Sequence, residues 1–89
     1  MLYITAIRLS SGGCQHEHIT DVRWQESGSL TTGQNSRAEM VAWIDKGGEA
    51  RVKDGASSVL VEVVRTNPPH LRTKANGRYT DNLLSLPRF

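Results

Sequence analysis

One helix signal, set among segments that resemble strands, places the strongest constraint on how this 89-residue chain can fold. Ser36 and Glu39 have the spacing of a capping box, in which the serine hydroxyl and the glutamate carboxylate satisfy backbone donors at a helix start. Apolar residues then recur at spacings of three and four, and Gly47-Gly48 follow as a stop signal. The pattern predicts a single amphipathic helix over about residues 37–46.

The rest of the chain carries strand patterns separated by turn residues. β-branched and aromatic residues alternate with polar ones in short runs, which is typical of strands. These runs cover residues 2–9, 17–25, 50–53, 58–65 and 70–74. The run Lys53-Asp54-Gly55-Ala56 predicts a turn, so the third and fourth of these strands are expected to form a hairpin. The polar stretch from Glu26 to Gln34 is predicted to be a loop.

These elements predict an α+β fold. A small, mainly antiparallel sheet of four to five strands carries one packed helix, in the order β-β-α-β-β-short β. A chain of this length is expected to form one domain, residues 1–89, because domains rarely divide below about 100 residues. In the first strand, the two-residue period is expected to place Thr5 and Ile7 on one face and Ile4 on the other.

Composition favours an ordinary cytoplasmic globule. Hydrophobic residues make up 37% of the chain, enough for a thin core, so self-association into a homodimer is one expectation. The longest apolar stretch, Val59-Leu60-Val61, is far shorter than the about 20 residues of a membrane span. Cys14 stands alone and cannot form an internal disulfide, and the first residues show no signal-peptide pattern. A cytoplasmic location without membrane contact is therefore expected.

Positive charge is concentrated in the last third of the chain. Residues 1–62 hold six Lys and Arg against eight Asp and Glu, a net charge of −2, whereas residues 63–89 hold five against one, a net charge of +4. The five cations are Arg65, Arg72, Lys74, Arg78 and Arg88. The first four could track phosphates while Tyr79, Trp24 or Trp43 stacks on bases, although the chain has no RNP motif, helix-turn-helix or basic helix. A solvated basic face with internal ion pairs is the other interpretation.

The two ends of the chain carry a family resemblance. The chain opens with Tyr3-Ile4-Thr5-Ala6-Ile7 and closes with His70-Leu71-Arg72-Thr73 followed by Asp81-Asn82-Leu83-Leu84-Ser85-Leu86-Pro87. This pattern resembles a family of small uncharacterised bacterial and phage proteins, domains of unknown function that end in Tyr-Leu-Arg-Thr and then Asp-Asn-Leu-Leu-x-Leu-Pro. His70 stands where that family has tyrosine, so no role of a tyrosine hydroxyl carries over. The resemblance implies a family and no activity.

The leucine-rich tail has two interpretations. In the first, its leucines fold back over an open end of the core. In the second, Leu84, Leu86 and Phe89 stay partly exposed as a hydrophobic docking patch rimmed by Arg78 and Arg88. The first predicts a structural role for the tail, and the second predicts a partner.

Cys14, His16 and His18 occupy alternate positions, so in a strand all three would share one face. A thiolate and two imidazoles are ligands for zinc or copper, and Glu17 or His70 would supply a fourth. One cysteine is fewer than most structural zinc sites use, and the sequence has no second ligand cluster. A zinc site at these three residues is therefore the third hypothesis about function.

The chain shows no catalytic signature, because it lacks a Gly-x-Ser-x-Gly elbow and a phosphate-binding loop. The sequence therefore predicts a non-enzymatic binding or accessory module that works through a protein partner or a second copy of itself. Weak nucleic-acid binding and metal binding are the alternatives. The residues expected to contact a partner or nucleic acid are Trp24, Arg65, Arg72, Lys74, Arg78, Arg88 and the Leu84-to-Phe89 end.

Overall fold

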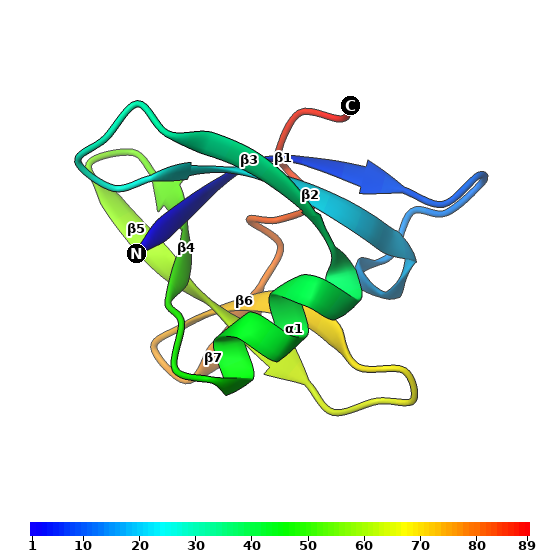
Figure 1. Cartoon of the computed structure of the whole chain (residues 1–89). Helices are drawn as coiled ribbons and strands as arrows, with labels where there is room; N and C mark the ends of the chain where they lie inside the picture. The colour runs from blue at the N-terminus through cyan, green and yellow to red at the C-terminus, as the bar shows by residue number, and fades with distance from the viewer.

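The computed structural model describes residues 1–89 and consists of a curled sheet with one α-helix packed against it (Figure 1). Its elements are β1 (Leu2–Leu9), the 3-10 turn η1 (His16–His18), β2 (Ile19–Glu26), β3 (Thr32–Ser36), α1 (Arg37–Asp45), β4 (Ala50–Asp54), β5 (Ser57–Val64), β6 (His70–Ala75) and β7 (Arg78–Thr80). The α+β class is confirmed. The predicted count of four to five strands is wrong, because the sheet has seven.

The strand order across the sheet is β3-β2-β1-β4-β5-β6-β7. All neighbouring pairs are antiparallel except β1 and β4, which are parallel and pair only at Leu2 and Tyr3. Beyond this point β4 diverges from β1, and the tail returns from β7 to form a parallel bridge between Ile7 and Arg88. One edge of β1 thus pairs with β4 at its start and with the tail, residues 81–89, farther along (Figure 1).

The helix α1 begins as the sequence predicts. The Glu39 N–H donates to the Ser36 hydroxyl at 3.2 Å, and the Ser36 N–H donates to the Glu39 carboxylate at 2.9 Å. These bonds favour the charged carboxylate and lower the pKa of Glu39. Met40 and Val41 are buried where the helix packs on β2, β3, β5 and β6. With nine residues, α1 is not long and apolar enough to cross a membrane, and it is the chain's one α-helix.

The buried core is a single cluster drawn from five strands, the helix and the tail. Its members are Ile4, Ile7, Ile19, Val22, Met40, Val41, Ala50, Val52, Val59, Val61, Leu71 and Leu83. In β1 the buried residues Ile4 and Ile7 are three apart, because the pairing with β2 shifts between Ile4 and Ala6. The extra residue of this β-bulge, Thr5, reverses the side-chain alternation. The expectation that Thr5 and Ile7 share a face is therefore wrong.

Two strands were not expected from the sequence. The predicted loop from Glu26 to Gln34 in fact contains the start of β3, which pairs with β2. Gly33 in β3 lies under the Trp24 indole, and a Cβ there would collide with the ring. The glycine is therefore needed for the ring to pack on the strand and does not mark a loop. At the other end of the sheet, Asn76 and Gly77 adopt positive φ values of 53° and 77° and turn the chain into β7.

Candidate functional site

The three residues of the expected metal site do not converge. His16 and His18 lie in the 3-10 turn η1 and not in a strand, so side chains two positions apart no longer share a face. His16 is buried, Cys14 is exposed, and the His18 Nδ1 accepts the backbone N–H groups of Cys14 and Gln15 at 3.1 Å each. The structure contains no group of three or more His, Cys, Asp or Glu residues that could hold a metal ion.

His16 instead packs under the tail, next to Arg72 and Asp81. Asp81 Oδ1 lies 3.9 Å from the His16 Nε2 and 3.2 Å from an Arg72 terminal nitrogen. Burial, together with the Arg72 charge, lowers the pKa of His16, and Asp81 opposes the shift only in part. The His16 Nε2 and the Arg72 Nε are buried without a hydrogen-bond partner. This cluster secures η1 and the tail against β6.

His70 is the second buried histidine. Its Nδ1 lies 2.8 Å from the Thr66 hydroxyl, and burial lowers the pKa of the imidazole. Neither His16 nor His70 lines any of the four hollows on the molecule. Both imidazoles are buried packing groups in this fold.

Most of the predicted basic residues are already paired within the fold. Arg65 forms an ion pair with Asp45 on α1, Arg72 pairs with Asp81, and Lys74 lies 3.8 Å from Glu62. Arg88 donates to the backbone carbonyls of Leu84 and Leu86 at 2.8 and 2.6 Å. Arg78 alone among the five is exposed without a recorded partner. Three of the five cations thus have a carboxylate partner, and two of these carboxylates, Asp45 and Glu62, come from the first two thirds of the sequence.

Two of these cations stack on Tyr79. The Arg72 guanidinium lies 5.3 Å, and the Lys74 ammonium 5.5 Å, from the centre of the Tyr79 ring, which is 47% exposed. We refer to Arg72, Lys74 and Tyr79 as the Tyr79 cluster. Each of its cations also has a carboxylate partner, so the cluster carries no free positive charge.

A second aromatic ring with two cations lies on β1, β2 and the tail. The guanidinium carbons of Arg8 and Arg23 lie 4.6 and 4.2 Å from the centre of the Phe89 ring, and the Arg8 Nε donates to the Phe89 carbonyl at 3.2 Å. We refer to these three residues as the Phe89 cluster. Asp21 stands opposite Arg8 in the strand register, yet neither arginine forms an ion pair. Sequence reasoning missed Arg8 and Arg23, because only the fold brings them to the tail.

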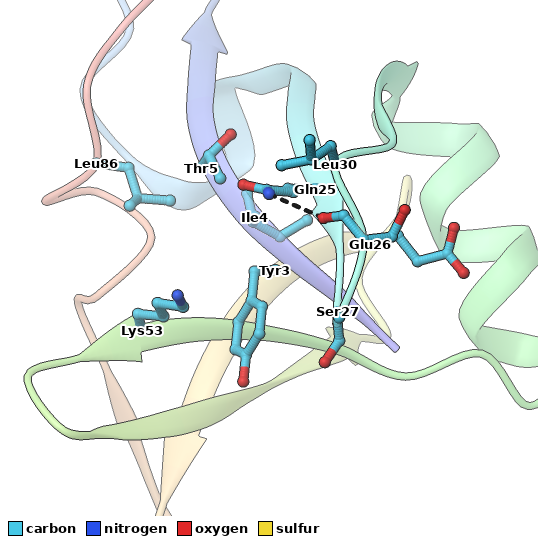
Figure 2. A pocket seen from close by; sticks show the side chains of 11 residues that line it. Tyr3, Ile4, Thr5, Gln25, Glu26, Ser27, Leu30, Lys53 and Leu86 are labelled. Carbon is cyan, nitrogen blue, oxygen red and sulfur yellow. Dashed lines mark hydrogen bonds between the residues drawn. The ribbon is translucent and has the colours of Figure 1, made fainter.

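The largest hollow lies where β4 diverges from β1, and Figure 2 shows its lining. This outer pocket has a volume of about 600 Å³ and is lined by Tyr3, Ile4, Thr5, Gln25, Glu26, Ser27, Gly28, Ser29, Leu30, Lys53 and Leu86. The Lys53 ammonium lies 4.9 Å from the centre of the Tyr3 ring. Glu26 extends away from Lys53 toward the helix, which leaves Lys53 as the charge on this side of the pocket (Figure 2).

The turn between β2 and β3 forms one wall of the outer pocket. The Gln25 side-chain amide donates to the Ser29 carbonyl at 3.0 Å and fixes the turn. Leu30, at its tip, is 92% exposed although it is a large apolar side chain. The tail forms the opposite wall with Leu86, whereas Leu83 is fully buried in the core. The first interpretation of the tail therefore holds for Leu83, and Leu86 stays partly exposed, while a docking role for the tail stays a prediction.

Trp24, the remaining predicted contact residue, faces the helix and not the outer pocket. Its indole N–H donates to the Asn35 side-chain oxygen at 2.7 Å. With Met40 and Trp43 it lines a smaller hollow of about 370 Å³ between β2 and α1. Its half-buried position stabilises the packing of the helix, and the sequence alone did not show which face it occupies.

The structure defines a small α+β domain whose mixed sheet curls around one helix, with its open hollows on the sheet face opposite the helix and at the helix flank. Residues 3–87 match the family model described as "Protein of unknown function (DUF3892)", and the chain belongs to this family. No curated protein and no solved structure matches the chain. The predicted membership of an uncharacterised family is confirmed, while the tail signature and a bacterial or phage source stay predictions.

Proposed function

We propose that the domain is a non-enzymatic protein-binding module that receives an apolar side chain of its partner in the outer pocket. The observation that carries this proposal is Leu30, which stands 92% exposed at the rim of a pocket of about 600 Å³. Burying such a side chain is worth about 1.5–3 kcal/mol, so a partner that covers Leu30 gains affinity. Tyr3 adds an aromatic wall of the kind that dominates binding energy at protein interfaces.

The pocket is held in place before any partner arrives. Tyr3 lies in β1, where its strand is paired on both sides, and Lys53 lies in the β4–β5 hairpin. The Gln25–Ser29 hydrogen bond fixes the turn that presents Leu30. A preformed site loses little conformational entropy on binding, which favours recognition of a flexible segment.

Single-stranded nucleic-acid binding is the second candidate function. Strand register aligns Tyr3, Arg51, Leu60, Lys74 and Tyr79 in one cross-strand row on the sheet face opposite the helix. Aromatic rings that alternate with cations can stack on bases and contact phosphates. Against this candidate, Arg51 lies 3.3 Å from Glu49 and Lys74 3.8 Å from Glu62, so the charge of the row is partly cancelled.

Selection from a displayed library of random peptides tests the proposal. We expect the wild-type domain to enrich peptides with a common apolar residue, and Leu30→Ser to lose them without loss of stability because Leu30 packs on nothing buried. Tyr79→Ser is the matched control, since Tyr79 is also exposed but lies on β7. If no peptide is enriched, the protein-binding function is contradicted. If instead labelled oligo-uridine binds and Tyr79→Ser abolishes this, the second candidate is correct.

Cys14 and the tail bear on the location and the source of the protein. We infer a cytoplasmic location, the compartment in which an exposed single thiol such as Cys14 stays reduced. We also infer a bacterial or phage source, which the resemblance of the tail to that family supports. The partner would be another protein or a second copy of this chain, and the concentration dependence of the domain's mass in solution separates these two cases.

A further inference from the structure

The Phe89 cluster and the outer pocket lie on one continuous face of the sheet. Gln25 pairs with Tyr3 in the pocket, and Arg23 is two residues along β2, so its side chain lies on the same face about 7 Å away. A second open hollow of about 530 Å³ includes Arg23 and shares Thr5 and Gln25 with the outer pocket. The apolar outer pocket is thereby joined to Arg23 in one groove, and Arg8 and Phe89 lie next to Arg23 at its end.

Arg23 is the open cation at the far end of the groove. Neither Arg8 nor Arg23 pairs with an Asp or Glu side chain, but Arg8 donates through its Nε to the main-chain oxygen of Phe89, whereas the Arg23 side chain forms no hydrogen bond. Both guanidinium groups lie over the Phe89 ring, and both arginines are exposed to solvent. Guanidinium N–H edges bind carboxylates with two parallel hydrogen bonds, which gives geometric specificity.

We propose that the partner of this groove is an acidic, extended protein segment. Its apolar side chain occupies the outer pocket beside Tyr3 and Leu30, and a carboxylate two residues away meets Arg23. The inference rests on the proposed protein-binding function and adds the chemistry of the ligand. The two-residue period of an extended segment, about 6.6–7 Å, matches the step from Gln25 to Arg23 along β2.

Charge complementarity selects this occupant. Lys53 in the pocket and the two arginines of the Phe89 cluster are three cations. Asp21 stands opposite Arg8 without pairing with it, and Glu26 is directed away toward the helix (Figure 2). A peptide fits the apolar wall of Leu30 and Leu86 as well as the cations. A nucleic-acid strand would instead place a charged phosphate at every nucleotide, including those that cross the apolar wall, which favours the peptide.

Fluorescence anisotropy with labelled synthetic peptides tests the inference. The probes are an extended peptide with one leucine and glutamates at alternate positions, the same peptide with glutamines, and a labelled oligo-uridine. We expect the glutamate peptide to bind the wild-type domain about fivefold more tightly than the glutamine peptide, which is the upper end of the range for a solvent-exposed ion pair, because Arg8 and Arg23 are both exposed. This preference should fall as salt increases.

Variants separate the two ends of the groove. Arg8→Ala/Arg23→Ala should reduce the preference to about twofold or less while leaving the glutamine peptide's affinity unchanged, because that peptide depends on the apolar end. Lys46→Ala/Arg78→Ala removes the same total charge from exposed residues that form no ion pair, and should retain the preference.

Each outcome decides a separate question. Equal binding of both peptides by the wild-type domain overturns the acidic-segment inference and leaves the protein-binding function standing. A preference lost equally in both double variants also overturns it, because a general charge effect would then be responsible. Binding of neither peptide removes the protein-binding function itself. Tighter binding of oligo-uridine, lost in Arg8→Ala/Arg23→Ala, would assign the groove to nucleic acid.

Discussion

The Tyr79 cluster and the Phe89 cluster use the same arrangement, an aromatic ring with two cations over it, yet they differ in charge. In the Tyr79 cluster, Asp81 and Glu62 neutralise both cations. In the Phe89 cluster neither arginine pairs with an Asp or Glu side chain, and Arg8 bonds the main-chain oxygen of Phe89. The difference shows that a cation is available for recognition only where the fold supplies no carboxylate. The charge of a sequence segment therefore does not predict which of its cations are available for recognition.

The two clusters also differ in how they are held. The Tyr79 cluster sits on the β6–β7 hairpin, whose residues are close in sequence. The Phe89 cluster depends on the return of the tail to β1, through backbone bonds between Ile7 and both Pro87 and Phe89. Perturbations of the tail should therefore act on the two clusters unequally.

Removing the anchor of the tail should have the largest effect. Leu83 is fully buried, so Leu83→Ala should lower the free energy of unfolding by about 2–5 kcal/mol through lost contacts and a cavity. Hydrogen exchange of the Ile7 and Phe89 amides should accelerate more than that of β6 amides. Equal acceleration in both regions would contradict the view that the Phe89 cluster depends specifically on the tail.

Acidification should destabilise the Tyr79 side of the molecule. Burial lowers the pKa values of His16 and His70 below 6.5 in the folded protein, so the unfolded chain binds more protons. Stability is therefore fully present above pH 6.5 and falls as the pH drops through 6.5 toward the folded values, by about 1.4 kcal/mol for each pKa unit of difference. Arg72 and His70 oppose protonation of His16, whereas Asp81 and Glu17 favour it.

Urea unfolding at pH 7.5 and 5.5 measures this loss, above the range in which ordinary carboxylates titrate. The double variant His16→Gln/His70→Gln should show a much smaller difference between the two pH values. If the difference is unchanged, the buried histidines are not its source.

Asp81→Asn should make the Tyr79 cluster resemble the Phe89 cluster. It removes the carboxylate that pairs with Arg72 and His16, at a cost of about 1 kcal/mol because Asp81 is 74% exposed. Arg72 then lacks a carboxylate partner. The peptide with one leucine and alternate glutamates, called the glutamate–leucine peptide below, should therefore bind weakly at β6–β7. Asp54→Asn, which changes an exposed carboxylate without an ion pair, is the control and should show neither effect.

Gln34→Glu makes the opposite change. Gln34 faces Arg23 across the β2–β3 pair, so a carboxylate there would neutralise the Phe89 cluster. We expect about threefold weaker binding of the glutamate–leucine peptide, equivalent to about 0.7 kcal/mol, and no loss of stability. Gln34→Asn keeps the site neutral and should bind like the wild type. Unchanged affinity in Gln34→Glu would exclude Arg23 from the interface.

The sequence predicted the parts of the fold that depend on local chemistry. The capping box at Ser36 and Glu39 fixed the start of α1, and the turn around Gly55 fixed the β4–β5 hairpin. It did not predict β3, because a strand rich in polar residues and glycine is stabilised by the Trp24 ring above it and not by its own propensity.

The candidate site was harder to predict for the same physical reason. Arg72, Lys74 and Arg88 are close in sequence and looked like a binding surface, but long-range folding gives them internal partners. Arg8 and Arg23 meet Phe89 only because the tail crosses back to β1. The two-residue spacing of His16 and His18 predicted that both side chains share one face of a strand. In the 3-10 turn that these residues form, side chains two positions apart point in different directions.

Chemical-shift mapping by NMR tests the central claim most directly. On titration of the labelled domain with the glutamate–leucine peptide, we predict shifts in the amides of residues 3–8, 21–25 and 29–30, and none in residues 70–80. This pattern would place an acidic segment along the groove from the outer pocket to the Phe89 cluster. Shifts centred on Tyr79 and β6, or no shifts at saturating peptide, would contradict the account.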